Sequence, residues 1–486
     1  MSGSVRTSSI VVRPGEFLLT SEQAESLTGG TWIGERATAH LRGAAFDSRQ
    51  AGAGCLFACL LGDRVDGHDF VAAAVTAGAN LILASRRVTA GVPVLLVADV
   101  PVALAALASE YRRRFDPACT WIAIGGANGK TTTKELIAAA CVAQAGSARI
   151  HATRGNLNNH LGVPITVLNA PGEARFAVIE LGANRPGEVA ALAAIVKPHI
   201  GVVTSIGPEH LEGFGSLEGV ARAECELFAA LPNGAPCFLG TGGMAAHAVA
   251  DHTSVDRLLS IVHAAAAGRR LVQVGDLPGD LPVRGRLFAD GIELSTDHGT
   301  ARLPLLGDHN LANATLAFRA AVAAGVSAEG ALGGLERVAP IAGRLVPRHM
   351  GAHLLLDDTY NANPASMFAG LAVLSRAPGR RLAVLGHMGE LGDASVAAHR
   401  QVGVEAARLG LPLIAIGAEA AVIAESCRAA GGIHAEEVAD VAAAVAVIRS
   451  HLAFGPTTVL IKASRSAALE RVVQALIAAH SNERPA

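Results

Sequence analysis

A strong charge of either sign is missing from this sequence, and so are the apolar runs that cross membranes. Its 486 residues carry 40 Lys and Arg against 42 Asp and Glu, a formal net charge of −2. No overall field therefore attracts nucleic acid or a membrane surface. The longest apolar run, 92–108, is broken by Asp99 and Pro101 and is too short to span a bilayer. We expect no nucleic-acid partner and no membrane insertion.

Regularly spaced cysteines and a secretion signal are missing as well. The 7 cysteines are scattered, and only Cys55 and Cys59 lie close together, without a second pair to complete a zinc site. The first twenty residues lack the basic and then apolar layout of a signal peptide. A reducing compartment, the cytoplasm, fits this pattern best. With 51% hydrophobic residues, the chain can bury the cores of two to four domains.

A glycine-rich segment between two apolar runs is the most informative part of the chain. The run 121–124 predicts a buried strand, and 134–141 has the composition of a helix. Glycines between them would let backbone N–H groups approach phosphates, and the helix would add its positive N-terminal end. Lys130 is then placed to reach the β- and γ-phosphates, and Thr131 to hold Mg²⁺. The segment is shorter than the common phosphate loop, since Ile124 replaces its first glycine, but a plain glycine-rich turn fits less well.

Strands and helices alternate after this segment. The runs 176–184 and 200–206 predict buried strands, and 186–196 predicts a helix with proline in its first turn. Such alternation is typical of a parallel sheet covered by helices, where ligands bind at the carboxyl ends of the strands. Glu180 and His210 follow such ends, as the lysine of the glycine-rich segment does. Each could alone be a cap or loop residue, but together they predict a nucleotide–metal site.

The pattern divides the chain into three α/β domains. A first domain, 1–117, ends shortly after a helix that starts at Pro101. The central domain, 118–340, holds the glycine-rich segment and, over 235–303, short alternating runs that indicate antiparallel hairpins. The third domain, 341–486, alternates short apolar strands with helices in a Rossmann-like manner.

The ordered motifs of the chain resemble those of the Mur ligase family, the ATP-dependent amide-forming enzymes of peptidoglycan synthesis. The resemblance covers almost the whole chain. It implies an N-terminal α/β domain that binds a UDP-sugar, a central ATPase domain of the phosphate-loop type with a mainly parallel sheet, and a C-terminal Rossmann-like ligase domain. The matching segments are 47–49, 56–57, 66–70, 126–135, 156–159, 180–184, 204–213, 343–344, 357–367, 385–392 and 462–465.

The resemblance implies an ATP-dependent peptide ligase. In the family, the γ-phosphoryl of ATP activates a carboxylate as an acyl phosphate, which an amine then attacks. Such chemistry depends on positioning and charge neutralisation. The run 357–367 resembles members that add D-alanyl-D-alanine to UDP-MurNAc-tripeptide, so we expect these two small molecules as substrates. The resemblance also implies ATP and two Mg²⁺ ions as cofactors, and a monomer.

The resemblance assigns nucleotide and metal roles to named residues. Thr131 and Glu180 belong by resemblance to one Mg²⁺ site and His210 to a second, and such a ligand set suits a hard divalent cation. Arg344 and Asp358 would reach the γ-phosphate and the ribose from the third domain, which requires that domain to close on the central one. The expected ATP-binding residues are Gly126, Asn128, Gly129, Lys130, Thr131, Thr132, Asn313 (for the adenine), Arg344 and Asp358.

Two groups of polar residues outside the glycine-rich segment are implied to hold the other substrates. Asparagine and proline favour turns, so turn formation remains an alternative explanation for them. The implied residues are Ser48, Arg49 and Asn159 for the UDP-sugar, and Tyr360, Asn361 and Asn363 for the dipeptide.

Four residues depart from the pattern of the family. Most Mur ligases have a lysine at the position of Glu224, and CO₂ converts it to a carbamate that helps to bind Mg²⁺. Histidine is usual at the position of Arg185, aspartate at His387 and glycine at Ala463. These changes favour, as alternatives, a peptide ligase of secondary metabolism with other acyl and amine substrates, or a nucleotide-binding protein without turnover. Loss of turnover is less consistent with the complete set of nucleotide-site residues.

Glu224 keeps a carboxylate where the carbamate would stand, on a stem shorter by roughly 3–4 Å. We expect it to bind Mg²⁺ through a water molecule, because Mg²⁺ gives up its waters reluctantly, and to make bicarbonate unnecessary. The alternatives are that it only supplies negative charge, or that it is a solvated helix residue. The expected catalytic residues are Lys130, Glu180, His210, Glu224 and Arg344.

Overall fold

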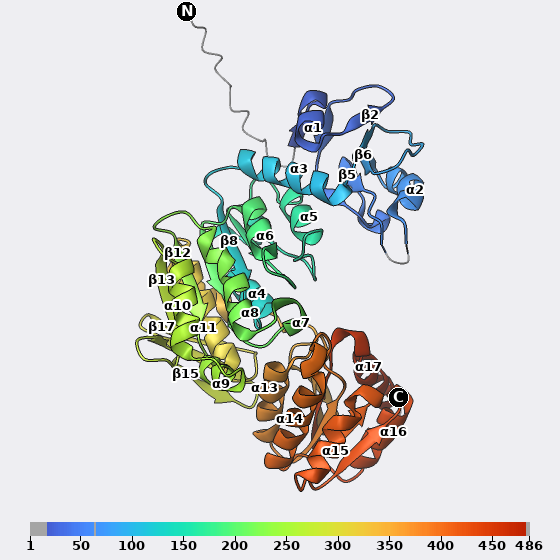
Figure 1. Ribbon diagram of the computed structural model, residues 1–486. Coiled ribbons are helices and arrows are strands. Elements are labelled where there is room, and N and C mark those ends of the chain that lie inside the picture. Colours follow the sequence, from blue (N-terminus) through green and yellow to red (C-terminus); the bar gives the residue numbers. More distant parts are fainter. Residues whose placement is uncertain (1–16, 63–64, 483–486) are drawn as a thin grey trace, which may run out of the picture.

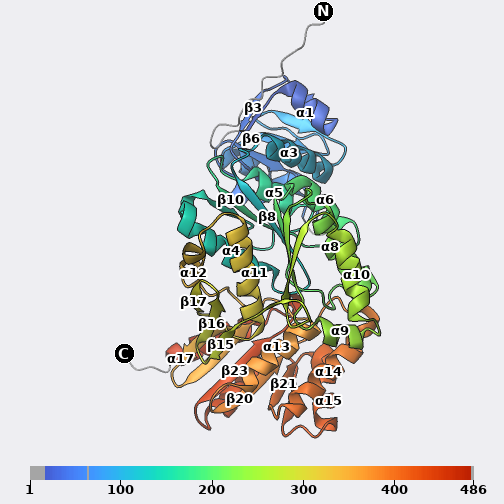
Figure 2. The ribbon, with the colours of Figure 1, turned by 90° about the vertical axis from the view of Figure 1, so that its left-hand side faces the viewer.

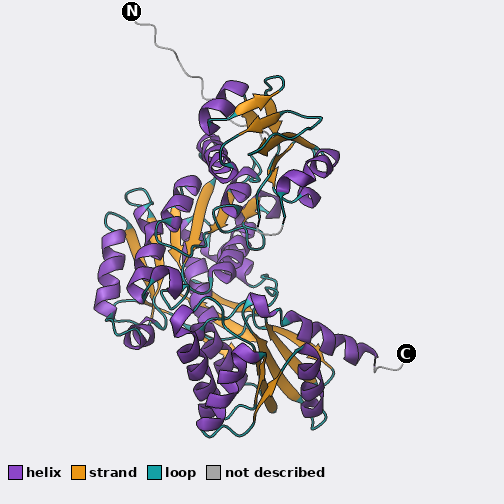
Figure 3. Ribbon diagram, turned by 45° about the vertical axis from the view of Figure 1, so that its right-hand side comes forward, coloured by secondary structure: helices purple, strands orange, loops and turns teal. Residues whose placement is uncertain are grey.

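The computed structural model describes residues 17–62 and 65–482, which form three α/β domains in a row (Figure 1). Each domain combines a sheet with helices (Figure 3), so the expected fold class is confirmed. Residues 1–16, 63–64 and 483–486, which the expected first and third domains include, lie outside the described residues. Within the described ranges, no helix is long and apolar enough to cross a membrane.

The first domain is built on a five-stranded sheet with the order β2-β7-β6-β5-β4, beside an antiparallel pair formed by β1 and β3. Its long helix, α3, starts where the sequence predicted, because Asp99 caps it by accepting the N–H of Val102 and a proline occupies its first turn. The elements are β1 (Phe17–Leu19), α1 (Ser21–Thr28), β2 (Thr31–Ile33), β3 (Ala39–Leu41), β4 (Ala44–Ala45), β5 (Cys55–Ala58), α2 (Val71–Thr76), β6 (Ala79–Ala84), β7 (Val94–Leu96) and α3 (Val100–Arg114).

Helix α3 also fastens the first domain to the central one. Arg112 in its last turn donates to the carbonyl of Val196 at 2.7 Å, and the hydroxyl of Tyr111 donates to the carbonyl of Ala170 at 2.5 Å. The ring of Phe115 packs edge-on against Trp121, at 5.3 Å between centroids, where the central sheet begins. One hydrophobic core runs through both domains, so they pack as a single unit.

The central domain holds a seven-stranded parallel sheet with the order β14-β13-β12-β11-β8-β10-β9. Its middle strands are almost wholly buried and apolar, as expected for a sheet covered on both faces. Figure 2 shows α4, α11 and α12 on one side of this sheet and α8 and α10 on the other. The strands are β8 (Thr120–Gly125), β9 (Ile150–Ala152), β10 (Phe176–Glu180), β11 (Ile200–Val203), β12 (Pro236–Gly240), β13 (Arg270–Gly275) and β14 (Leu281–Pro282). The helices are α4 (Lys130–Ala145), α5 (Gly162–Leu168), α6 (Glu188–Val196), α7 (Leu211–Phe214), α8 (Leu217–Ala229), α9 (Met244–Ala250), α10 (Val255–Ala265), α11 (His309–Ala323) and α12 (Ala328–Leu335).

Two local predictions for the central domain need correction. The interpretation of 235–303 as hairpins is wrong for β12 and β13, which join the parallel sheet. Only β15 (Gly285–Phe288), β16 (Gly291–Thr296) and β17 (Gly299–Leu303) form an antiparallel meander. Helix α6 begins after the proline expected in its first turn, because Gly187 adopts a left-handed conformation, φ +88°, and starts the helix itself.

The third domain has a six-stranded sheet with the order β18-β19-β23-β20-β21-β22, in which only β18 runs antiparallel to its neighbour. The motifs 357–367, 385–392 and 462–465 lie at the carboxyl ends of β19, β20 and β23. The elements are β18 (Val346–Met350), β19 (His353–Asp358), α13 (Pro364–Ser375), β20 (Arg380–Leu385), α14 (Ser395–Arg408), β21 (Leu413–Ile416), α15 (Ala421–Ala429), β22 (Ala435–Val438), α16 (Val441–Leu452), β23 (Thr457–Lys462) and α17 (Glu470–Asn482).

Candidate active site

The glycine-rich segment forms a tight turn between β8 and α4. Gly126 and Gly129 have left-handed backbones, with φ of +112° and +85°, which other residues rarely adopt. A Cβ atom on Gly129 would lie 2.5 Å from the Asn313 amide oxygen, so a side chain has no room there. The carbonyl of Asn128 accepts from the Thr204 hydroxyl at 2.6 Å and fixes the turn. The loop can therefore bring phosphates close to its backbone.

Lys130 is the first residue of α4 and points back across the turn. Its Nζ donates to the carbonyl of Gly126 at 2.5 Å and forms an ion pair with Glu209 at 3.2 Å. The side chain is 14% exposed. Burial lowers the pKa of Lys130, but the carboxyl groups of Glu209, Glu224 and Glu180 outweigh this and raise it. The ammonium is therefore charged and lies where phosphates would enter.

Thr131 links the central and third domains. Its Oγ1 donates to Glu180 Oε1 at 3.2 Å and accepts from the Arg344 guanidinium at 2.9 Å. Glu180 Oε1 also accepts from Asn158 at 2.8 Å. The structure thus brings together three of the predicted residues, one of them from the third domain.

The oxygens around Thr131 suit a hard divalent cation. Glu180 is 3% exposed, and its Oε2 has no hydrogen-bond partner among the described residues. No cluster of three or more His, Cys, Asp or Glu in the described ranges is arranged to hold a metal. A cation such as Mg²⁺ would therefore need phosphate oxygens and water besides the protein, which is its usual coordination.

Glu224 is not a solvated helix residue. It is fully buried on α8, and its Oε2 accepts the N–H of Gly126 at 2.5 Å, while Oε1 has no partner among the described residues. Glu209 lies within hydrogen-bonding reach of it. Burial and the nearby Glu224 raise the pKa of Glu209 to about 8, although Lys130 opposes this. Sequence reasoning missed Glu209, whose only signal was its place directly before His210 after a strand.

His210 joins the central domain to the third domain. Its Nδ1 lies 2.9 Å from Glu390 Oε2, on the loop after β20. The residue has a left-handed backbone, φ +43°. Burial lowers the pKa of His210, and Glu390 opposes that effect. The predicted metal ligand is therefore close to the phosphate loop but paired with a carboxylate of the other domain.

Of the other predicted third-domain residues, Asn363 contacts the phosphate loop, and the remaining three are held by neighbours within the third domain. Asn363 donates from its side chain to the Asn128 side chain at 2.9 Å, and it also caps α13. The Arg344 guanidinium stacks on the Tyr360 ring at 4.5 Å. Asp358 forms an ion pair with Lys462 at 2.7 Å. Asn361 is held through its carbonyl, which accepts from the same lysine at 3.0 Å.

Asn313 lies against the phosphate loop from the side of α11. Its Nδ2 donates to Asn310 at 3.0 Å, and its Oδ1 accepts from Thr133 at 3.4 Å. Both asparagines are buried. An adenine placed beside Gly129 would thus meet amide groups that are already fixed.

Residues predicted for the UDP-sugar lie apart from the phosphate loop. Arg49 is on a short turn in the first domain and pairs with Asp47 at 2.7 Å, which holds the pKa of Asp47 at about 2. Ser48 begins the same turn. Asn159 starts the segment before α5, and its Oδ1 accepts the N–H of Gly162 at 3.0 Å. Among the described residues, no hydrogen bond or ion pair joins any of these three to the loop.

The three other residues that depart from the family pattern differ in burial and in polar contacts. His387 lies between Ser466, at 2.9 Å from its Nε2, and Glu419, at 3.3 Å from its Nδ1. Ala463 is buried at the end of β23. Arg185 is exposed near the start of α6. Only His387 has polar side-chain contacts at the carboxyl edge of the third sheet.

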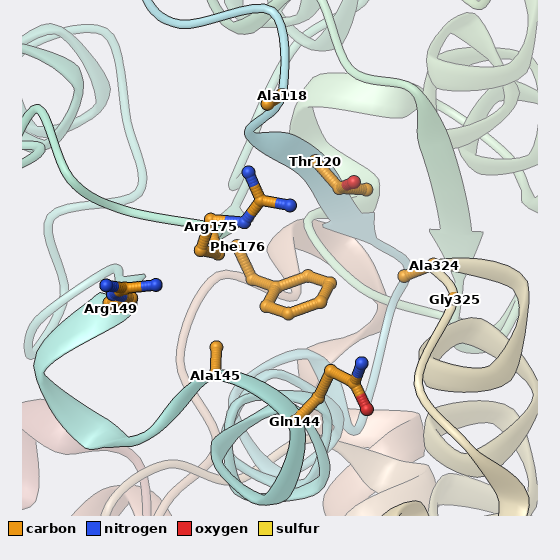
Figure 4. Close-up of a pocket in the computed structure, with 9 residues that line it drawn as sticks. All are labelled: Ala118, Thr120, Gln144, Ala145, Arg149, Arg175, Phe176, Ala324 and Gly325. Carbon is orange, nitrogen blue, oxygen red and sulfur yellow. The ribbon is translucent and has the colours of Figure 1, made fainter.

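A cavity of about 390 Å³ lies at the amino ends of the strands β8 and β10, away from the carboxyl ends that hold the phosphate loop (Figure 4). Arg149, Arg175 and Phe176 line it, and the chain enters α4 only at the other end of β8. None of the predicted site residues contributes to its wall. The candidate site is therefore the phosphate loop and the interface above it, not this cavity.

The comparisons with known proteins match all three domains. The model described as "Mur ligase middle domain" matches residues 124–321, "Mur ligase, glutamate ligase domain" matches 343–465, and "Mur ligase family, catalytic domain" matches 40–112. The UDP-N-acetylmuramoyl-tripeptide–D-alanyl-D-alanine ligase of Escherichia coli is 37% identical over 438 residues, 88% of this chain and 92% of its own length.

Solved structures agree with this match. The crystal structure of MurF from Acinetobacter baumannii superposes with a TM-score of 0.83 at 32% identity, covering 96% of this chain and 100% of that one. The MurF ligase from Thermotoga maritima in complex with ADP has a TM-score of 0.75 at 25% identity, with 91% and 98% covered. The similarity thus extends through the whole three-domain arrangement.

Proposed function

Because this chain belongs to the Mur ligase family, we propose that it joins D-alanyl-D-alanine to UDP-N-acetylmuramoyl-tripeptide, with cleavage of ATP to ADP and phosphate. The main support is one contact, from Arg344 of the third domain to Thr131 beside the phosphate loop. It brings two cationic side chains, of Lys130 and Arg344, to the place where a γ-phosphoryl group would be transferred. The product would be a peptidoglycan precursor, made in the cytoplasm, where ATP is available.

The chain contributes positioning and charge rather than a covalent intermediate. The loop N–H groups and Lys130 would hold the phosphates, while Arg344 would neutralise the charge that develops on the transferred group. The substrate carboxylate attacks the γ-phosphorus, and the resulting acyl phosphate is attacked by the amine of the dipeptide. Phosphate then leaves from the tetrahedral carbon, and the amide bond is formed.

We assign two Mg²⁺ ions to the carboxylates around the loop. Thr131 and Glu180 would hold one of them, and His210 and Glu224 belong to the second. When bound there, the ions would supply positive charge that neutralises the phosphates during phosphoryl transfer. The buried and unpartnered Glu180 Oε2 supports this assignment.

The remaining predicted residues are proposed to bind the organic groups. Asn313 would read the adenine and Asp358 the ribose. The UDP-sugar would contact the first domain, and the dipeptide the loop after β19. The residues assigned to these substrates are Ser48, Arg49 and Asn159 for the UDP-sugar, and Tyr360, Asn361 and Asn363 for the dipeptide.

A coupled assay tests this function. Purified protein is mixed with ATP, Mg²⁺, UDP-MurNAc-tripeptide and D-alanyl-D-alanine, and phosphate release and the amide product are followed together. We expect both to require all three substrates. His387, where the family usually has aspartate, supports trying other dipeptides and amino acids in parallel. Turnover with another amine, but none with D-alanyl-D-alanine, would favour a peptide ligase of secondary metabolism.

A further inference from the structure

Two carboxyl groups are buried side by side next to the phosphate loop. Glu209 is 6% exposed and Glu224 is fully buried. They lie within hydrogen-bonding reach of each other. Each also has one oxygen that meets no donor in the described part of the chain, Oε1 in both cases.

Such a pair is expensive to bury without a positive partner. A buried carboxylate loses its hydration, and an unpaired oxygen recovers none of that loss. Lys130 is the nearby cation, but it faces three carboxyl groups, those of Glu209, Glu224 and Glu180. One ammonium does not balance three carboxylates, so the two glutamates need either a proton shared between them or a second cation. Phosphates must bind at the same place, and a divalent cation in the position of that proton would also neutralise them.

The remaining contacts limit what each carboxyl group can reach. The Oε2 of Glu224 is engaged by the N–H of Gly126, which leaves only Oε1 to face the site. The stem of a glutamate is also shorter than that of a lysine carbamate, by roughly 3–4 Å. Glu209 comes from another segment, the loop after β11, and its Oε1 has no hydrogen-bond donor among the described residues.

We propose that Glu209 and Glu224 together hold the second divalent cation, and that Glu209 makes up for the shorter reach of Glu224. This rests on the proposed function, since it concerns the metal ions of the same nucleotide site. Mg²⁺ commonly takes one or two carboxylates and completes its shell with phosphate oxygens and water. A pair of carboxylates supplied by the chain needs no carbamate, so bicarbonate has no part in the site.

The same geometry assigns a second role to Glu209, that of a placeholder for phosphate. In the structure the Oε2 of Glu209 forms an ion pair with the Lys130 ammonium at 3.2 Å, in the place that a phosphate oxygen would take. When nucleotide and cation enter, Lys130 turns to the phosphates and Glu209 turns to the cation. Each charge thus exchanges one partner for another, and none is left alone in the buried site.

Counting bound Mn²⁺ tests the proposal without turnover. The protein is saturated with a non-hydrolysable ATP analogue and titrated with Mn²⁺, and electron paramagnetic resonance reports the free ion. We expect two ions per wild-type chain. Glu209→Gln and Glu224→Gln should each weaken the second ion by at least about tenfold and leave the first in place. Glu212→Gln, an exposed carboxylate on the next turn, serves as the matched control and should keep both ions.

Several outcomes would overturn the proposal. A single Mn²⁺ on the wild-type protein, a second ion that appears only with added bicarbonate, or two ions of unchanged affinity in Glu209→Gln would each do so. If that variant fails to fold, Glu209→Asp keeps the charge and should retain the second ion with reduced affinity. The Mn²⁺ titration contains no acyl or amine substrate, so a negative result would overturn the metal assignment without bearing on amide formation. Two bound ions without any amide product in the coupled assay would count against the proposed function alone.

Discussion

We propose that Lys130 carries the charge on which phosphoryl transfer depends. We expect Lys130→Ala to lower the rate of amide formation by about 100-fold or more, because an oriented charge of this kind is worth several kcal/mol in the transition state. Steady-state assays with all three substrates measure this, and circular dichroism checks that the fold is kept. Lys197→Ala removes an exposed lysine and should have a normal rate. A near-normal rate in Lys130→Ala would show that the phosphate loop is wrongly assigned.

His151 should make the protein less stable in mild acid. Burial lowers the pKa of His151 from 6.5 to about 4, and its Nε2 lies 2.7 Å from the carbonyl of Thr166, which a neutral ring can satisfy. The unfolded chain binds a proton at this residue at higher pH than the folded chain does. Stability from this residue is therefore complete above pH 6.5 and falls as the pH drops towards 4.

Urea unfolding of wild type and His151→Asn at pH 7 and pH 4.5 measures this effect. The free energy of unfolding of the wild type should fall by roughly 1–3 kcal/mol more than that of the variant between these two values. Comparing the two chains cancels the contribution of the other histidines. Equal losses in both chains would mean that His151 is protonated in the folded state as easily as in the unfolded one.

Individual site residues could be predicted where they stand at the ends of strands that the sequence pattern places side by side. Lys130, Thr131 and Glu180 follow strands that lie next to each other in a parallel sheet, so their meeting follows from the pattern of the chain. Glu209 could not be predicted in this way, because its partner Glu224 comes from a helix later in the sequence. Only the packing of α8 under the loop brings the two together.

The phosphate loop is packed between helix α4, which follows it, and helix α11, which carries Asn313. We expect Gly129→Ala to disturb this packing. An alanine at φ +85° is strained and its Cβ would press on Asn313. We expect the free energy of unfolding to fall by about 1–3 kcal/mol, and nucleotide affinity to fall as the loop moves.

Calorimetric titration with ADP and Mg²⁺ measures the affinity. Gly234→Ala is the matched control, since φ is +76° there and nothing lies within 4 Å of the added atom. It should lose stability but bind ADP normally. If both variants bind ADP equally well, the shape of the loop does not matter for nucleotide binding, and the assignment of this loop as the phosphate-binding loop is wrong.

Helices and strands could be predicted where apolar residues recur regularly. The prediction failed where the pairing or the start of an element depends on a neighbouring segment. The strands β8, β10 and β11 are continuous apolar runs, and such runs are typical of a parallel sheet covered on both faces. The segment 235–303 has shorter runs, and only the existing edge at β11 makes β12 and β13 parallel partners. Similarly, the start of α6 depends on the backbone of Gly187 rather than on the proline before it.

In the whole molecule, the third domain touches the central one through few polar contacts, so it should move. The polar contacts are Arg344 to Thr131, Asn363 to Asn128, His210 to Glu390 and Arg376 to Asp308. Of the central domain, Leu306 packs into the core of the third domain. By contrast, the first domain shares its core with the central one. The structure already has these contacts, so it represents the closed arrangement. We expect the third domain alone to swing away from it without nucleotide and to return to it when nucleotide binds.

Small-angle scattering with and without a non-hydrolysable ATP analogue and the acyl substrate tests this closure. The radius of gyration should decrease when both are bound, and Arg344→Ala should weaken the change and the rate together. Arg348→Ala alters an exposed arginine of the same domain and should behave like wild type. An unchanged radius, with wild-type activity in Arg344→Ala, would contradict domain closure.

The transfer of ¹⁸O from substrate to phosphate tests the central claim most directly. UDP-MurNAc-tripeptide labelled with ¹⁸O in its terminal carboxylate is incubated with ATP, Mg²⁺, D-alanyl-D-alanine and the protein, and mass spectrometry is applied to both products. An acyl phosphate predicts one ¹⁸O in the released phosphate and one retained in the new amide. Unlabelled phosphate, or AMP and pyrophosphate in place of ADP and phosphate, would contradict the assignment of this chain as an ATP-dependent ligase of the acyl-phosphate type.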